Sequence, residues 1–211
     1  MNTPASTRGF EVLTAVMLGL VSVTTALGAW QASVWNAQAS ELGEDSGDAR
    51  DVSVSQAVLA DYARRGDLES SLAARRADAQ LESAEGLESL LYETRITIEL
   101  AKATPGFGDA WREWQAAGFP AEADPIDDQD YLLDRDGAYQ TYAYASSVAG
   151  DLASRVGAKS GILAQAALIQ ALALFVFGIS GVNKLASVRA GVLGLGIVVF
   201  IAGIALAATA F

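Results

Sequence analysis

The sequence predicts an all-α integral membrane protein with three transmembrane helices and an extracytoplasmic helical bundle. Three observations carry this prediction. Long apolar segments lie at both ends of the 211-residue chain, and every acidic residue except Glu11 lies between Glu41 and Asp151. The acidic middle shows helical apolar spacing and few turn signals. The chain therefore has two physically different parts, one suited to lipid and one to water.

The first apolar segment, residues 10–30, carries one charge, Glu11, at its edge. At ~1.5 Å per residue it forms a helix of about 31 Å, which matches a hydrocarbon core of about 30 Å. Residues 161–182 and residues 190–211 form two further segments of this kind. Their only polar side chains are those of Gln165, Gln170, Ser180 and Thr209. We expect one transmembrane helix in each segment.

The short loops set the expected orientation. Arg8 precedes the first span, and the loop at residues 183–189 carries one lysine, one arginine and no acid. Positively charged short loops stay in the cytoplasm, so residues 1–9 and 183–189 are expected there. Residues 31–160 then form a periplasmic or extracellular domain of a multi-pass inner membrane protein. Cleavage of the first segment as a signal peptide is an alternative, which its long apolar core disfavours.

The acidic middle is expected to be helical throughout. "SVSQAVLADYARRG" predicts a short helix that ends at Gly66, after which Asp67 caps a longer helix to about Ala103. A brief helix follows in "DAWREWQAAGFP", and a final helix runs unbroken from near Asp128 to Val182. Two apolar stripes should form the core. They are Ala73, Ala77, Leu81, Ala84, Leu87, Leu91, Thr94, Ile98 and Ala101, and then Ala138, Tyr142, Ala145, Ala149, Leu152 and Val156.

Small side chains recur at heptad spacing in two of the spans. The first seam is Ala15, Gly19, Ser22, Ala26, Ala29, Ser33, Asn36 and Ser40. Because it continues past the first span, that span is expected to extend outward as a rod and to pack in an antiparallel bundle. The second seam is Gly196, Gly203 and Ala207. Two such seams exceed what one three-helix monomer needs, so we expect a homo-oligomer.

Tryptophans mark the outer end of the first span. Trp30 ends the span, and Trp35 lies about one and a half turns beyond it among Gln, Ser and Asn residues. Tryptophan is enriched at the level of lipid headgroups, so both are interpreted as interfacial anchors. An aromatic site for a lipid or quinone-like headgroup is the alternative. Trp111 and Trp114, three residues apart, are expected to clamp the bundle tip rather than to form a ligand box.

Four of the polar side chains inside the predicted spans, those of Ser22, Thr25, Gln165 and Gln170, are candidates for contacts within the membrane. Counting inward from the outer boundary places Gln165 level with Thr25, and Gln170 level with Ser22. Hydrogen bonds between these helices would be worth about 0.6–2 kcal/mol each. As an alternative, the four side chains line a pore in an oligomer. The spans hold no ring of charges that could select ions.

The chain contains no cysteine and no histidine. This excludes thiol nucleophiles, imidazole general bases and the usual ligands of zinc, copper and haem. The acid-rich "DPIDDQDYLLDRDG" fails the EF-hand pattern, because Leu132 and Leu133 stand where a ligand and the glycine belong. We therefore expect no enzyme activity, no metal and no cofactor. The acidic middle also disfavours binding to nucleic acid.

In layout the chain resembles uncharacterised bacterial three-span integral membrane proteins. The likeness rests on "GAWQASVWNAQASEL", "AWREWQAAGFP" and "LALFVFGISGVNKLASVRAGVLGLGIVVFIAGIAL". It implies a bacterial membrane location and supplies no catalytic residues. The leading hypothesis is a non-enzymatic, oligomeric scaffold or partner-binding subunit that acts through its outer domain. Its partners would be membrane lipid and other membrane or periplasmic proteins. A homo-oligomeric channel and an accessory subunit of a larger complex are the alternatives.

Overall fold

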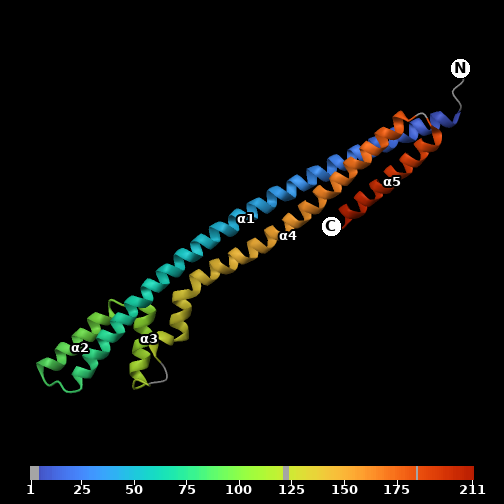
Figure 1. Ribbon diagram of the computed structural model, residues 1–211. Coiled ribbons are helices and arrows are strands. Elements are labelled where there is room, and N and C mark those ends of the chain that lie inside the picture. The colour runs from blue at the N-terminus through green and yellow to red at the C-terminus, as the bar shows by residue number, and fades with distance from the viewer. Residues whose placement is uncertain (1–4, 121–123, 184) are drawn as a thin grey trace. The chain divides into compact units, whose positions relative to one another are not determined.

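The computed structural model describes residues 5–120, 124–183 and 185–211, and the regular elements in this part of the chain are all helices (Figure 1). The helices are α1 (Ala5–Leu81), α2 (Leu87–Leu100), α3 (Pro105–Ala116), the 3-10 turn η1 (Pro125–Asp127), α4 (Gln129–Val182) and α5 (Ala186–Ala208). The all-α class is confirmed.

Two helices are continuous over great length. The sequence predicts the unbroken α4 and the outward extension of the first span, but not that α1 runs on to Leu81. The helix that contains the first apolar segment does not end at Trp30 but continues as α1 as far as Leu81. Helix α4 runs from Gln129 to Val182, which confirms a single helix across the boundary between the acidic middle and the second apolar segment. Helices α1, α4 and α5 each contain a stretch long and apolar enough to cross a membrane.

The chain divides into two compact units. Unit 1 consists of Met1–Glu44 and Ala149–Phe211, and unit 2 consists of Asp45–Val148. Unit 1 therefore contains the three apolar segments, and unit 2 contains most of the charged residues. Each unit is described by itself below.

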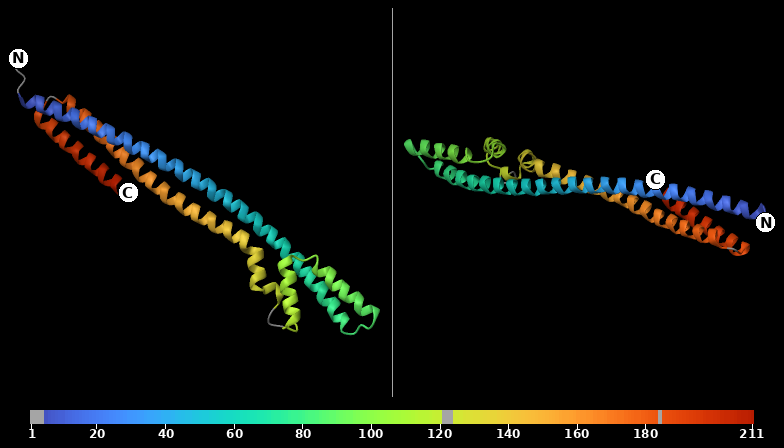
Figure 2. Two further views of the ribbon diagram at one scale, coloured as in Figure 1. Left: turned by 180° about the vertical axis from the view of Figure 1, so that it is seen from behind. Right: turned by 90° about the horizontal axis from the view of Figure 1, so that it is seen from above.

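In unit 1, parts of α1, α4 and α5 run side by side in all three views (Figures 1 and 2). Ser160 Oγ donates a hydrogen bond to the carbonyl oxygen of Ala32 at 2.8 Å, which fixes the register of α1 against α4. Two apolar clusters form the core. They are Val21, Ala173, Phe177, Leu193 and Phe200, and then Ala32, Leu163 and Ala210.

The small-residue seam predicted in α1 does not pack within the chain. Every residue of that seam is exposed, including Ser22 and Ala29. The contact face lies on neighbouring positions such as Val21 and Ala32, which are buried. Heptad spacing fixes the period of a packing face but not its direction, and the larger Val21 side chain fills the space beside Phe177. This correction leaves the exposed seam available only for contacts outside the chain.

The second predicted seam, in α5, is already used within one chain. A Cβ atom on Gly196 would lie 2.7 Å from the Phe177 ring, and one on Gly203 would lie 2.9 Å from Gln170 Cγ. The absence of side chains therefore lets α5 approach α4 closely. This seam is therefore used for packing within the chain, and the homo-oligomer expected from the two seams stays a prediction.

In unit 2, α1 continues through Gly66, where the sequence predicts an end, and stops at Leu81. The helix expected from Asp67 to Ala103 is therefore the end of α1 followed by α2. The break falls at residues 82–86, where Gly86 has a φ of 61° that favours glycine. Gly66 costs the helix about 1 kcal/mol relative to alanine, and the packing of the buried residues beside it offsets that cost.

Because the helices begin and end at other residues than predicted, the core of unit 2 also differs from the predicted one. Ala77 is buried as predicted, but Leu87, Leu91 and Ile98 are exposed, Leu87 by 84%, and Ile96 is buried instead. The second predicted stripe, on α4, is exposed or half-buried throughout its length. The observed core consists of Ala74, Ala77, Ile96, Phe107, Ala110, Trp111 and Tyr131.

The short helix that closes unit 2 is close to its prediction. Helix α3 starts at Pro105 rather than at Asp109, because a proline at the first helical position loses no hydrogen bond. It ends before Gly118, whose φ of 82° marks the predicted stop.

Candidate functional site

Among the described residues, the four polar side chains predicted for the spans form no hydrogen bond with one another. Ser22 donates to the carbonyl oxygen of Leu18, and Thr25 donates to that of Val21, each at 2.7 Å. Both hydroxyl protons are therefore used within α1 itself. Hydroxyls in helices commonly bond the carbonyl four residues back in this way. A pore lined by these residues remains a prediction.

The two glutamines of α4 have opposite environments. Gln165 is exposed, whereas Gln170 is only 4% exposed. Five residues advance a helix by about 140° beyond a full turn, so the two side chains cannot share a face. The contact between Ser160 and Ala32 sets a register in which Gln170, ten residues further inward on α4, lies level with Ser22 on α1, as the sequence places it. The Gln170 side chain lines a cavity together with Thr24.

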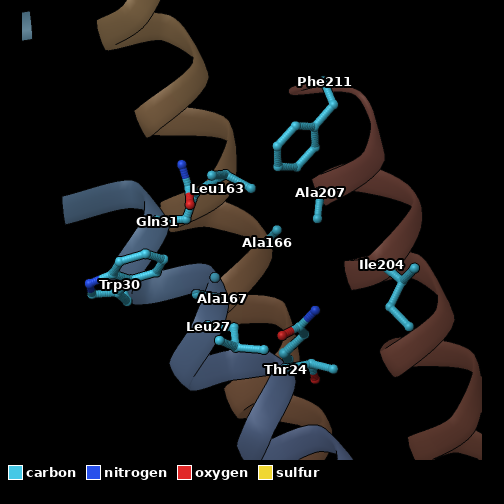
Figure 3. A pocket seen from close by; sticks show the side chains of 12 residues that line it. Thr24, Leu27, Trp30, Gln31, Leu163, Ala166, Ala167, Ile204, Ala207 and Phe211 are labelled. Carbon is cyan, nitrogen blue, oxygen red and sulfur yellow. The ribbon is translucent and has the colours of Figure 1, made fainter. Parts of the chain in front are cut away.

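That cavity lies among α1, α4 and α5 and has a volume of about 390 Å³. Figure 3 shows Leu27 and Trp30 on the α1 wall and Ile204 and Ala207 on the opposite α5 wall. Four residues of α4 line the cavity between these walls, Gln170 among them, and Phe211 lies just beyond the end of α5. The α4 residues labelled there are Leu163, Ala166 and Ala167.

Gln170 is the unusual member of this lining. Its Oε1 atom is buried and has no hydrogen-bond partner among the described residues. The hydroxyl of nearby Thr24 donates instead to the carbonyl oxygens of Leu20 and Val21, at 3.1 and 3.0 Å. A buried amide oxygen without a donor costs about 1–3 kcal/mol. The site therefore combines an apolar cavity with one unsatisfied acceptor.

The predicted interfacial tryptophans differ in exposure. Trp30 is 63% exposed and lines the cavity. Trp35 is half-buried, and its ring lies 5.3 Å from that of Phe211, between centroids. Lys159 Nζ lies 5.4 Å from the Trp35 ring centroid, a cation–π contact. The role of both as lipid anchors remains a prediction.

Unit 2 contains a buried polar node that the sequence does not reveal. The carboxylate of Asp67, 1% exposed, accepts hydrogen bonds from Thr104 N and Thr104 Oγ1 at 2.7 Å and from Tyr131 OH at 2.8 Å. It thereby joins α1, the start of α3 and α4. Burial, and then the bond to Asp67, raise the pKa of Tyr131 to about 12. Asp67 therefore connects three helices and does not cap one.

The aromatic residues of α3 pack as the sequence predicts. Trp111 is buried, and the Trp114 ring lies edge-on to Phe119 with centroids 4.7 Å apart. Trp114 Nε1 donates to the carbonyl oxygen of Pro120 at 2.9 Å, and the Arg75 guanidinium lies 4.5 Å from the Trp114 ring centroid. These contacts fill the tryptophan faces with protein groups.

The acid-rich stretch before α4 is engaged in local structure. The side chain of Asp124 accepts from Ile126 N at 3.1 Å and pairs with Arg75 at 2.8 Å. Asp128 accepts from Tyr131 N at 3.0 Å at the start of α4. Within the described ranges, no group of three or more acidic residues is placed to hold a metal ion.

Large apolar side chains are also exposed along α1 within unit 2. Val54, Val58, Leu68 and Leu72 are each roughly half exposed. Together with Asp61 and Arg65 they follow one another at spacings of four and three residues. We call these six residues the α1 ridge. The spacing is that of a coiled-coil seam.

Protein-family models, curated proteins and solved structures give no match to this chain. The resemblance to three-span bacterial membrane proteins therefore remains a prediction. The fold itself defines the class: an all-helical protein with three helices compatible with a multi-pass membrane protein.

Proposed function

We propose that this protein is a non-enzymatic, multi-pass bacterial membrane protein that acts as an oligomeric scaffold through unit 2. Its three apolar helices lie in the inner membrane, its N-terminus is cytoplasmic, and unit 2 stands in water on the far side. The apolar side chains exposed along α1, α4 and α5 in unit 1 support the lipid location, because in lipid they carry no hydrophobic penalty.

The observation that carries the scaffold role is the α1 ridge. Unit 2 is strongly acidic, yet it exposes Val54, Val58, Leu68 and Leu72 in one row. Apolar side chains gathered on a water-exposed surface mark contacts with other proteins, and on the α1 ridge two apolar pairs flank Asp61 and Arg65. A row with alternating spacings of four and three residues fits another helix.

The partner that best fits this row is the ridge of a second copy. Copies in one membrane emerge from it in the same direction, so the pairing is parallel, with Val58 facing Val58 and Leu68 facing Leu68. Asp61 and Arg65 form an ion pair of 2.7 Å on the exposed surface of one copy. At the centre of the seam they can exchange partners between copies, and polar residues at such positions specify register.

Cysteine cross-linking tests this pairing cleanly, because the chain has no cysteine of its own. Val58→Cys should form a disulfide-linked dimer in isolated membranes under mild oxidation. Leu59→Cys is the matched control, since Leu59 is also exposed but lies off the ridge. Adding Leu68→Glu should abolish the Val58 cross-link by bringing like charges together.

Two results would contradict the proposal. One is equal cross-linking at positions 58 and 59. The other is cross-linking only in the double variant Val58→Cys/Leu68→Cys, which would indicate antiparallel pairing. The channel alternative predicts ion flux across liposomes that contain the purified protein, and loss of that flux in Gln170→Leu. The scaffold proposal predicts no flux.

A further inference from the structure

The cavity of unit 1 has three features that call for a ligand. Its volume of about 390 Å³ is within the range of small-molecule sites. Its walls are almost entirely apolar, with Leu27, Leu163 and Ile204 among them. Gln170 supplies a buried amide whose Oε1 lacks a donor.

The Gln170 amide cannot readily turn elsewhere for a partner. Its Cγ lies 2.9 Å from the point where a Cβ of Gly203 would be, so α5 packs directly against the stem of the side chain. The hydroxyl of Thr24 is already committed to the carbonyl oxygens of its own helix. The donor that Gln170 lacks must therefore come from outside the chain.

We propose that the cavity binds a membrane amphiphile with an apolar chain and a hydroxyl group, which donates a hydrogen bond to Gln170. A hydroxyl both donates and accepts, so it matches either end of an amide. The apolar chain lies along Leu27, Ala166 and Ile204. Trp30, which is mostly exposed, lines the cavity on the α1 side and lies within reach of the bound molecule.

This inference rests on the proposed lipid location of unit 1 but not on the oligomeric scaffold. Isoprenoid alcohols and diacylglycerols share the required chemistry, an alkyl body with one O–H donor. Phosphatidylcholine does not share it, because its headgroup has neither an O–H nor an N–H donor. Bulk lipid of that kind can occupy the cavity without satisfying Gln170.

The test compares two probes that differ only in the donor. The full chain is placed in phosphatidylcholine nanodiscs and titrated with bromododecanol or with its methyl ether, and tryptophan quenching by bromine is followed. The alcohol should bind about three- to tenfold more tightly, the value of one buried hydrogen bond. Equal binding of alcohol and ether by the native chain overturns the proposal without any variant.

Variants assign the preference to one residue. In Gln170→Met, which preserves the length of the side chain, alcohol and ether should bind equally. Gln165→Met is the matched control, because Gln165 is exposed and does not line the cavity. It should retain the full preference. An alcohol preference that survives in Gln170→Met, or disappears in Gln165→Met, contradicts the assignment.

The location and the source of the ligand are tested in the same nanodiscs. Trp30→Phe should lose much of the quenching, and unchanged quenching would place the probe elsewhere. Unlabelled farnesol and dioleoylglycerol then compete with bromododecanol. Displacement by the first identifies an isoprenoid alcohol, displacement by the second a diacylglycerol, and displacement by neither counts against the proposal.

Discussion

Two glycines of α5 provide a sharp test of the packing in unit 1. A Cβ atom on Gly196 would lie 2.7, 2.9 and 3.1 Å from three atoms of the Phe177 ring. That ring is fully buried, so it cannot move aside. Overpacking of this kind costs about 1–3 kcal/mol, and Gly196→Ala should lie in the upper half of that range.

Gly194→Ala is the matched control. It lies two residues away on the same helix, and a Cβ atom there meets nothing within 4 Å. Its effect should stay within about 0.5 kcal/mol, or be slightly stabilising because alanine is the better helix former. Gly203→Ala, whose Cβ would meet the more flexible stem of Gln170 at 2.9 Å, should fall between the two.

The assay is unfolding of the full chain in mild detergent by a titrated denaturing detergent, followed by helical circular dichroism. From the most to the least stable, the variants should rank Gly194→Ala, then Gly203→Ala, then Gly196→Ala. A Gly196→Ala variant as stable as Gly194→Ala would show that α5 does not pack on α4 through this glycine, and the packing described for unit 1 would be refuted.

Three further predictions concern unit 2. Ile96→Ala should destabilise it by about 2–4 kcal/mol and Leu91→Ala by less than about 0.5 kcal/mol in urea unfolding, because only Ile96 is buried; the reverse order would restore the stripe expected from sequence. Asp67→Ala should cost about 3–5 kcal/mol by leaving Thr104 N and two hydroxyls without their acceptor, and a loss below about 1 kcal/mol would contradict the node. The pKa of Tyr131 is raised to about 12, so the stability that this tyrosine contributes is complete below about pH 10 and is lost as the pH rises from about 10 to about 12. In Tyr131→Phe this loss of stability at alkaline pH should be smaller. An alkaline unfolding transition unchanged by the substitution would argue against this role of Tyr131.

Some features of this fold follow from the pattern of residue types along the sequence, whereas others depend on contacts between residues far apart in the chain. The helical type follows from the sequence, and so does the continuity of α4, which runs to Val182 without a break. The direction of a packing face does not follow, because the small seam and the observed face at Val21 and Ala32 have the same period. The two faces differ by a shift of one residue along the helix, which turns the face by about 100° around the helix axis.

Glycine and aspartate show a second limit. Gly66 and Asp67 have the sequence signature of a helix stop and a new N-cap, yet both lie inside α1. The helix continues because Asp67 finds donors on Thr104 and Tyr131, residues far away in the chain. These long-range hydrogen bonds outweigh the local tendency of Gly66 and Asp67 to end one helix and begin another. No residue pattern within α1 predicts the bonds.

The candidate site was partly visible in the sequence. An intramembrane glutamine is a natural suspect, and both Gln165 and Gln170 are singled out on that ground. Their spacing shows that they face apart, but the choice of the buried one depends on α5 and on the absence of a side chain at Gly203. Phe211 and Trp30 join the same cavity from opposite ends of the chain, which sequence spacing does not predict.

The central claim is that lipid surrounds the three apolar helices while unit 2 stands in water outside the cytoplasm. Single-cysteine labelling of intact cells with a membrane-impermeant maleimide tests it directly, since the chain has no native cysteine. Glu85→Cys, at the exposed turn of unit 2, should be labelled at once, whereas Ala186→Cys should be labelled only after the cells are permeabilised. Labelling of Ala186→Cys in intact cells with protection of Glu85→Cys would invert the orientation, and recovery of either variant in the soluble fraction would contradict the membrane location.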